Sequence, residues 1–133
     1  MTIQAAEEEE KILSIDIGGS RIKGTLLDVN GNTLIDYQRI STPKFPGPEN
    51  VMQGIVHLTR NFNGFTKVSV GFPGYVREGT VYTAPNLGTN KWRKVPLGKE
   101  LSNLLKKPVR VVNDADMQGL GVSTGEGLEM VIT

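Results

Sequence analysis

Residues 16–23 read Asp-Ile-Gly-Gly-Ser-Arg-Ile-Lys, and the first two of them end a largely apolar run that begins at residue 11. An apolar run of this length predicts a buried strand, and the paired glycines predict a turn into a second strand. A carboxylate inside such a run is costly unless it has a function. Glycine N–H groups can surround a phosphate, while Asp16 can hold Mg²⁺ through water and Ser20 can donate its hydroxyl group.

Two basic residues follow the glycines. Arg21 and Lys23 are two positions apart, so they share one face of the second strand and can neutralise more phosphate charge. A plain hairpin turn with a solvated aspartate is the alternative interpretation. The candidate phosphate and Mg²⁺ site, in which no protein group binds the metal directly, comprises Asp16, Gly18, Gly19, Ser20 and Lys23.

Three extended runs surround this stretch and open the chain. Residues 11–17 and 21–29 flank the glycines, and Asn30-Gly31 predicts a two-residue turn into a third strand at residues 33–42. Strands joined by such short turns are antiparallel. The sequence therefore predicts an antiparallel meander at the start of the fold.

The rest of the chain alternates helical and extended patterns. Between residues 49 and 133 the predicted elements are a helix at 49–61, a strand at 67–72, a Gly-rich hairpin-like stretch, a leucine-marked helix around 97–105, a strand at 109–112, a helix at 113–123 and a strand at 128–133. Strand–helix–strand units require parallel strands. We therefore expect an α/β fold with a mixed five-stranded sheet, three antiparallel strands followed by parallel ones, and helices on both faces.

Composition excludes several classes of protein. The 133 residues, 38% apolar and 22% charged, fit one globular domain, and the 16 glycines suggest backbone close to a ligand. Without cysteine and with a single histidine, His57, a disulfide framework or a Cys/His zinc site is not expected, and His57 is expected at the surface of its helix. Four consecutive glutamates within residues 1–10 predict a disordered acidic tail. With neither a secretion signal nor an apolar span, we expect a cytoplasmic protein without membrane contact.

A basic segment lies in the second half of the chain. Seven of the 15 basic residues fall between Lys91 and Arg110, where Glu100 is the single acidic residue. Such a segment can bind a polyanion, or it can be an ordinary solvated surface.

A second group of residues has the character of a sugar site. Gly71-Phe72-Pro73-Gly74 follows a predicted strand, and Asn86 and Trp92 come later in the Gly-rich stretch. Exposed backbone, an amide and an aromatic ring suit the recognition of sugar hydroxyl groups. Turns, with Trp92 in the edge of the core, are the alternative.

A third group follows the strand at 109–112. Asn113 and Asp114 stand at the strand-to-helix junction, where they are either capping residues or a catalytic pair at the carboxyl end of a central strand. A carboxylate there can accept a proton from an attacking hydroxyl group. Asp116, two residues further on, is the weaker candidate.

Taken together and in this order, the three motifs resemble the amino-terminal half of the ROK family of sugar kinases, within the hexokinase and actin-like ATPase superfamily with its ribonuclease H-like fold. The Gly-Gly-Ser loop and residues 113–116 look most like those of the polyphosphate glucokinases of this family. The resemblance covers residues 11–133. It implies that residues 11–127 form the amino-terminal lobe and that residues 128–133 begin a second lobe.

The resemblance also implies roles for single residues. Asp114 would be the base that deprotonates a sugar hydroxyl group, while Gly74, Asn86 and Asn113 would bind the hexose. The phosphate loop would bind the donor, ATP or inorganic polyphosphate, with Mg²⁺. It further implies a homodimer without nucleic acid, and a chain that is inactive without its second lobe.

Other functions stay open at this point. A ROK kinase for mannose or an N-acetylated hexosamine fits the same motifs, and so does a noncatalytic sugar-binding or regulatory ROK protein. For the donor, the segment between Lys91 and Arg110 suits polyphosphate, so reversing the charges of Lys91, Arg93 and Lys94 is expected to weaken the use of polyphosphate more than that of ATP.

Overall fold

The computed structural model describes residues 10–115. The strand predicted at 128–133, Asp116, and most of the helix predicted at 113–123 and of the acidic tail lie outside the described residues. Within them, no helix is long and apolar enough to cross a membrane.

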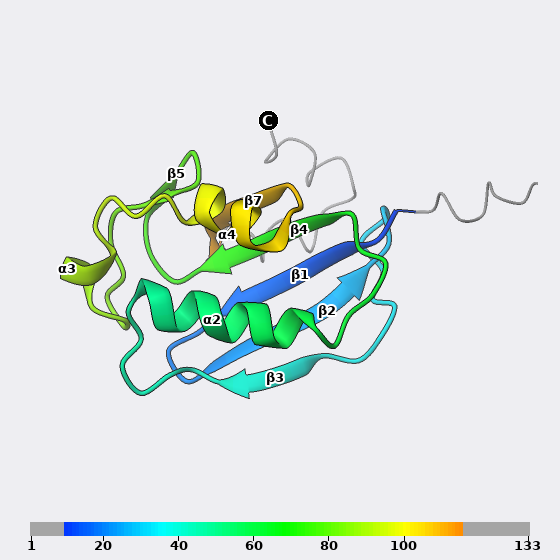
Figure 1. The fold of residues 1–133 in the computed structure, drawn as a ribbon, viewed down its shortest axis with the longest axis horizontal. Helices are drawn as coiled ribbons and strands as arrows, with labels where there is room; N and C mark the ends of the chain where they lie inside the picture. Colours follow the sequence, from blue (N-terminus) through cyan, green and yellow to red (C-terminus); the bar gives the residue numbers. More distant parts are fainter. Residues whose placement is uncertain (1–9, 116–133) are drawn as a thin grey trace, which may run out of the picture.

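A mixed five-stranded sheet forms the centre of the fold, as the sequence predicts (Figure 1). Its order is β3-β2-β1-β4-β7, so the first strand of the chain lies in the middle. The β1–β2 and β2–β3 pairs are antiparallel, whereas β1–β4 and β4–β7 are parallel. The strands are β1 Ile12–Ile17, β2 Arg21–Leu27, β3 Gln38–Ser41, β4 Lys67–Phe72 and β7 Val109–Asn113.

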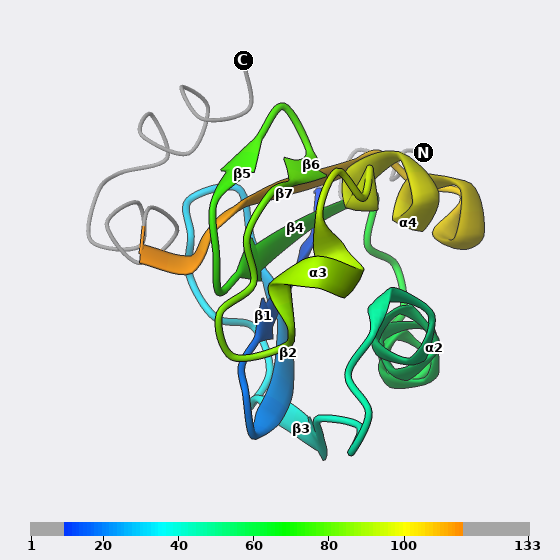
Figure 2. The same ribbon diagram turned by 90° about the vertical axis from the view of Figure 1, so that its left-hand side faces the viewer.

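Two helices cover one face of this sheet. Helix α2, Pro48–Thr59, and helix α4, Leu97–Leu105, lie on the same side (Figure 2) and contact each other. The strands turn alternate side chains toward them, and Ile15, Val70 and Ile55 are fully buried between the layers. The sequence also predicts helices on the second face. Most of the helix predicted from residue 113 lies outside the described residues.

The predicted third strand is wrong at its start. Residues 33–37 form a connection with one isolated bridge, between Leu27 and Thr33, and β3 begins only at Gln38. The turn is not a two-residue hairpin either, because Asp28 organises it: its Oδ1 accepts hydrogen bonds of 2.9 Å from the N–H groups of Asn30 and Asn32. A side chain that bonds the backbone in this way competes with strand pairing.

The Gly-rich stretch contains the expected hairpin and a short helix. Strands β5, Val76–Arg77, and β6, Thr80–Val81, pair through a two-residue turn, and α3 spans Thr89–Trp92. Both turn residues, Glu78 and Gly79, have positive φ, at 52° and 80°. Two positive φ angles are what the tight turns between twisted strands require.

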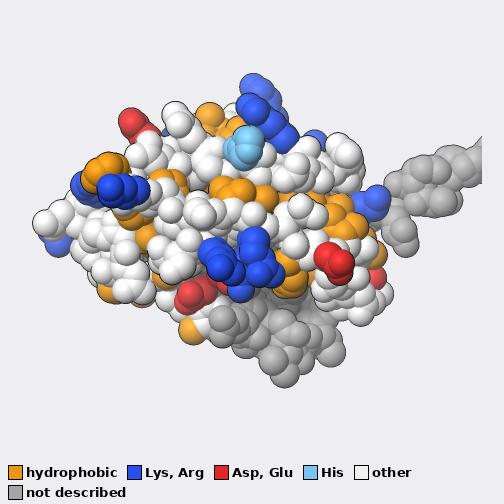
Figure 3. Space-filling model, turned by 90° about the horizontal axis from the view of Figure 1, so that it is seen from below, with side chains coloured by type: hydrophobic (Ala, Val, Ile, Leu, Met, Phe, Trp, Pro, Cys, Tyr) orange, Lys and Arg blue, Asp and Glu red, His pale blue; other side chains and the backbone are white. Residues whose placement is uncertain are grey.

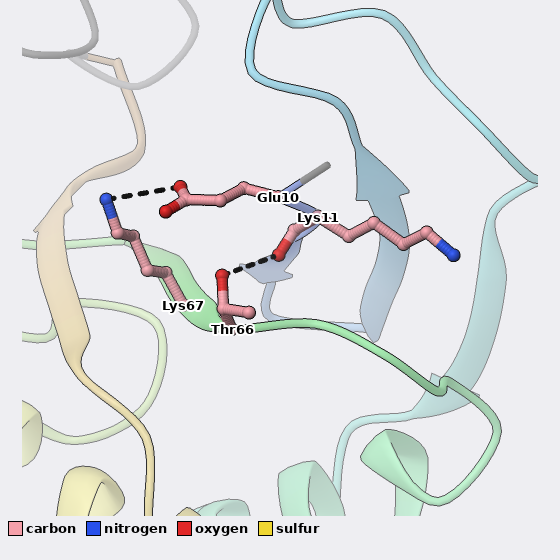
Figure 4. Close-up of polar contacts among 4 residues, drawn as sticks. All are labelled: Glu10, Lys11, Thr66 and Lys67. Carbon is pink, nitrogen blue, oxygen red and sulfur yellow. Dashed lines mark hydrogen bonds and ion pairs between the residues drawn. The ribbon is translucent and has the colours of Figure 1, made fainter. Parts of the chain in front are cut away.

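The amino ends of β1 and β4 are fastened to each other (Figure 4). Thr66 donates two hydrogen bonds to the carbonyl oxygen of Lys11, from its N–H group at 2.9 Å and from Oγ1 at 3.5 Å. Glu10 Oε1 lies 3.4 Å from Lys67 Nζ. These contacts fix the register of the parallel pair, and thereby the positions of the residues at its carboxyl end.

Candidate functional site

The carboxyl ends of β1, β4 and β7 meet at one edge of the sheet, because the three strands are parallel. Figure 2 looks onto this edge. Open α/β sheets bind their ligands at such an edge. Each of the three motifs singled out in the sequence follows one of these strands.

The glycine loop after β1 is held from two sides. Gly18 donates its N–H group to the carbonyl oxygen of Arg21, at 2.9 Å, and a Cβ at Gly18 would lie 3.0 Å from that same oxygen. Thr42, just after β3, donates from Oγ1 to the Gly18 carbonyl at 2.7 Å and from its N–H group to the Ser20 carbonyl at 2.9 Å. Gly19 and Ser20 stay exposed at the tip, where a phosphate could approach them.

Asp16 lies between two neighbouring strands. Its Cα pairs with Lys23 on β2 and with Gly71 on β4. Burial raises the pKa of Asp16, and the carboxylate of Asp114 raises it further, whereas Lys23 lowers it. The structure therefore brings together the two aspartates that the sequence assigns to phosphate binding and to catalysis, although they are far apart in the chain.

Asn113 links the end of β7 to the loop after β4. Its Nδ2 donates to the Gly74 carbonyl at 2.6 Å, and its Oδ1 accepts the N–H group of Ala115 at 2.9 Å. The predicted cap is therefore present. The second N–H of the side-chain amide is a further donor with which Asn113 can bind a ligand.

Gly74 is also packed against the segment that follows β6. A Cβ at this position would lie 1.9 Å from the carbonyl oxygen of Thr83, so only glycine fits without a shift of the backbone. The Thr83 hydroxyl accepts the N–H group of Tyr75 at 2.9 Å. The Gly74 N–H group donates to the Phe72 carbonyl oxygen at 3.0 Å, so the Gly74 carbonyl oxygen, which accepts one bond from Asn113, is the backbone group that can accept a further bond from a ligand.

Asn86 lies next to the glycine loop. A Cβ at Gly19 would be 3.5 Å from the Cβ of Asn86, and the Asn86 side chain is exposed. Two turn hydrogen bonds to the carbonyl oxygen of Ala84, at 3.0 and 2.8 Å, hold this segment. The amide proposed for the sugar and the loop proposed for the phosphate are thus neighbours.

Trp92 does not serve as an aromatic platform. It is fully buried, its Nε1 donates to the Pro46 carbonyl at 2.9 Å, and its ring centroid lies 4.8 Å from that of Phe72. The alternative interpretation, a residue of the core, is therefore correct. His57 is exposed on α2, as expected.

Sequence reasoning missed two residues that shape the site, Thr42 and Thr83. Each uses its hydroxyl group to hold a loop that carries predicted site residues. The sequence offered little signal, because Thr42 bonds to a residue 24 positions away and threonines outside motifs are common in strands.

The carboxylate groups of the site suit Mg²⁺ bound together with phosphate. Two carboxylates, Asp16 and Asp114, are close enough to influence each other, and a hard cation that prefers oxygen would relieve their repulsion. Among residues 10–115 no group of three His, Cys, Asp or Glu side chains could hold a metal. Asp16 would bind the ion through water, and phosphate oxygens would be further ligands.

Comparison with known proteins shows the family of the chain. The ROK family matches residues 12–130. The polyphosphate glucokinase of Mycobacterium tuberculosis (strain H37Rv) is 36% identical over 112 residues, covering 80% of this chain and 40% of that protein. The glucokinase of Streptomyces coelicolor is 33% identical over 114 residues, covering 82% and 34%. The chain therefore spans well under half the length of these relatives.

Solved structures share the fold. The inorganic polyphosphate/ATP-glucomannokinase of Arthrobacter sp. strain KM superposes with a TM-score of 0.77 at 32% identity, covering 84% of this chain and 47% of that one. The ROK family glucokinase of Streptomyces griseus, in complex with glucose and AMPPNP, gives a TM-score of 0.70 at 29% identity, covering 80% and 34%. By sequence and by fold, the chain belongs to the ROK family.

Proposed function

We propose that this chain is the lobe of a sugar kinase that binds the phosphoryl donor and part of the sugar, in an enzyme that transfers a phosphoryl group to a hexose hydroxyl group. The observation that carries the proposal is the approach of Asp16 to Asp114, beside the glycine loop and the Gly74 backbone. Relatives named glucokinase and polyphosphate glucokinase support it. Glucose is accordingly the first sugar to test.

The reaction needs a base and an anion site side by side. Asp114 accepts the proton of the hydroxyl group, whose oxygen attacks the terminal phosphorus of the donor. The bond from that phosphorus to the bridging oxygen of the donor breaks, and the shortened donor leaves with the electron pair. Such transfer depends mainly on positioning and on charge neutralisation.

The residues of this chain divide these tasks. The exposed loop at Gly19 and Ser20 offers backbone and hydroxyl donors to the phosphates, and Lys23 adds positive charge. Asp16 would hold Mg²⁺ through water. When bound, Mg²⁺ neutralises charge that develops on the phosphate oxygens.

The sugar would lie on the other side of Asp114. The Gly74 backbone and the amides of Asn86 and Asn113 offer hydrogen bonds to its hydroxyl groups. All of these residues lie at the same edge of the sheet. We assign ATP or inorganic polyphosphate as the donor, because relatives of both kinds share this lobe.

Replacing the base tests the function directly. In the full-length enzyme, Asp114→Asn should lower kcat by about 10²- to 10⁴-fold, the usual contribution of general base catalysis, with the Kd for glucose changed less than about twofold. A coupled assay for glucose 6-phosphate and calorimetric titration with glucose measure the two quantities.

The matched control is Asp36→Asn, an exposed carboxylate in the connection before β3. It should leave both quantities unchanged. Near-normal turnover by Asp114→Asn would refute the assignment of the base, and a wild-type enzyme that binds glucose without phosphorylating it with any donor would refute the kinase.

The same assay with other sugars tests specificity. Mannose and N-acetylated hexosamines are the alternative acceptors, because the residues of this chain would bind only part of the sugar. A kcat/KM for one of them above that for glucose would reassign the substrate and leave the chemistry intact.

A further inference from the structure

Three basic side chains share the face of the sheet that α2 and α4 leave uncovered. A Cβ at Gly24 would meet Leu58 and Phe62 on the helix side. Side chains alternate along a strand, so Arg21 and Lys23, which are three positions and one position away, point to the opposite face. Arg39 on β3 pairs directly with Lys23 and joins them there. All three are exposed.

Figure 3, which views the molecule from below and so onto the β3 edge, shows basic side chains gathered near the middle of this side. We name Arg21, Lys23 and Arg39 the basic strip. Across the sheet, Arg39 on β3 lies opposite Lys23 on β2, and Lys23 lies opposite Asp16 on β1. The strip therefore starts beside the proposed reacting end of the donor and leads away from it toward β3, the outermost strand of the sheet.

The pairing within the strip is unfavourable in the absence of an anion. Like charges directly opposite each other on antiparallel strands are destabilising. Between described residues the structure has one ion pair, Glu10 with Lys67, at the far end of the sheet. No described carboxylate lies within ion-pair distance of Lys23 or Arg39; Asp16, the other cross-strand neighbour of Lys23, attracts it only from further away. The two opposed cations therefore suit a bound polyanion.

The glycine loop connects directly to the strip. Arg21 follows the loop, and Thr42, which fastens the loop, follows β3. A phosphate chain whose terminal group lies at Gly19 and Ser20 would pass along Lys23 and reach Arg39 only if it extends beyond the loop.

We propose that the basic strip binds the tail of inorganic polyphosphate, a linear phosphate chain longer than the triphosphate of ATP. This proposal rests on the proposed function and assigns its donor. It adds Arg39, on the edge strand, to the residues that determine which donor is used.

The other basic surface is less suited to a polyanion. Lys91 lines a groove of about 490 Å³ at the start of α2, which Glu49 and Glu100 also line. Carboxylates that line a groove repel a chain of phosphates. Arg60, directly after α2, provides a matched control, because it is an exposed cation outside the strip and outside the segment between Lys91 and Arg110.

The test compares Arg39→Gln with Arg60→Gln in the full-length enzyme, using long-chain sodium polyphosphate and ATP as alternative donors. Arg39→Gln should raise the KM for polyphosphate about fivefold, the equivalent of an exposed ion pair of roughly 1 kcal/mol, and change the KM for ATP less than about twofold. Arg60→Gln should change neither KM, and Arg39→Lys should keep the KM for polyphosphate close to that of the wild type.

A direct titration with polyphosphate separates binding from turnover. Arg39→Gln should raise its Kd about fivefold at low salt, and the difference should shrink as salt screens the charges. Urea denaturation should show a free energy of unfolding equal to or above that of the wild type, because the like-charge pair is removed.

Three results would overturn the strip: an unchanged KM for polyphosphate in Arg39→Gln, an equal rise for both donors, or a larger effect in Arg60→Gln. A wild-type enzyme that uses no donor refutes the kinase instead. The titration still tests the strip in that case, so the two failures are distinguishable.

Discussion

Asp16 is a half-buried carboxyl group, and the fold raises its pKa by burial and by the charge of Asp114, against the opposing effect of Lys23. The folded state therefore binds a proton at Asp16 more readily than the unfolded state does. The contribution of Asp16 to stability falls as pH rises from its ordinary pKa through the raised one, and stays low above it. At neutral pH the charged Asp16 of the empty site therefore lowers the stability of the folded protein.

Asp16→Asn should accordingly stabilise the empty protein at pH 7. The gain over the wild type should be smallest near pH 4 and should grow as pH rises, because asparagine carries no charge to be buried. Urea denaturation between pH 4 and 8 measures it. Asp36→Asn is the exposed control, and parallel pH profiles for wild type and Asp16→Asn would contradict the assignment of the pKa shift.

The residues of the site differ in how far the sequence predicts them. The positions of Asp16 and Asp114 could be predicted, since each lies where an apolar run ends and parallel strands bring their carboxyl ends together. Their roles stay predictions. The roles of Thr42 and Thr83 could not be predicted, because their hydrogen bonds depend on how loops pack. Trp92 was ambiguous, because an aromatic ring in a loop suits both a sugar and a core.

Among the elements, α4 shows what helical spacing leaves undetermined. Leu97, Leu101, Leu104 and Leu105 predict the helix correctly, yet Leu101 is fully buried whereas Leu104 is 54% exposed. The helix is at the edge of its layer, over β7, so only part of its apolar side faces the core (Figure 1).

This difference predicts unequal costs for the same substitution. Leu101→Ala should lower the free energy of unfolding by about 2–5 kcal/mol, since it opens a cavity in the core. Leu104→Ala should change it by less than about 0.5 kcal/mol. Chemical denaturation of the two variants checks the pair, and similar losses would show that Leu104 is covered in solution.

The strands show a different limit of sequence reasoning. Residues 11–17 and 67–72 were predicted to within one residue, because buried strands are continuous apolar runs. The start of β3 was not, because Asp28 captures the turn and residues 33–37 are exposed. Alternation alone cannot distinguish a paired edge from an exposed connection.

At the scale of the whole molecule, the candidate site is an open edge, with Gly19, Ser20 and Asn86 exposed. Phosphoryl transfer works best where water is excluded from the reacting groups. Since relatives of this family are much longer than this chain, we infer that the rest of their length supplies the covering surface.

The 133-residue chain by itself should therefore phosphorylate glucose at a rate indistinguishable from background, while still binding polyphosphate weakly along the basic strip. A coupled assay and a polyphosphate titration on the isolated chain measure both. Sustained turnover by the isolated chain would contradict the need for a covering surface.

The strand order also has a consequence for how the fold is reached. β1 has β2 as its neighbour on one side, close in sequence, but its partner on the other side is β4, beyond residues 18–66. The local meander can form early, whereas closing that long loop carries an entropic cost before the parallel pairing compensates for it. During synthesis, one side of β1 should therefore stay unpaired until β4 has emerged, up to residue 72. Unpaired strand edges promote aggregation, so the growing chain should be most prone to aggregate during this interval.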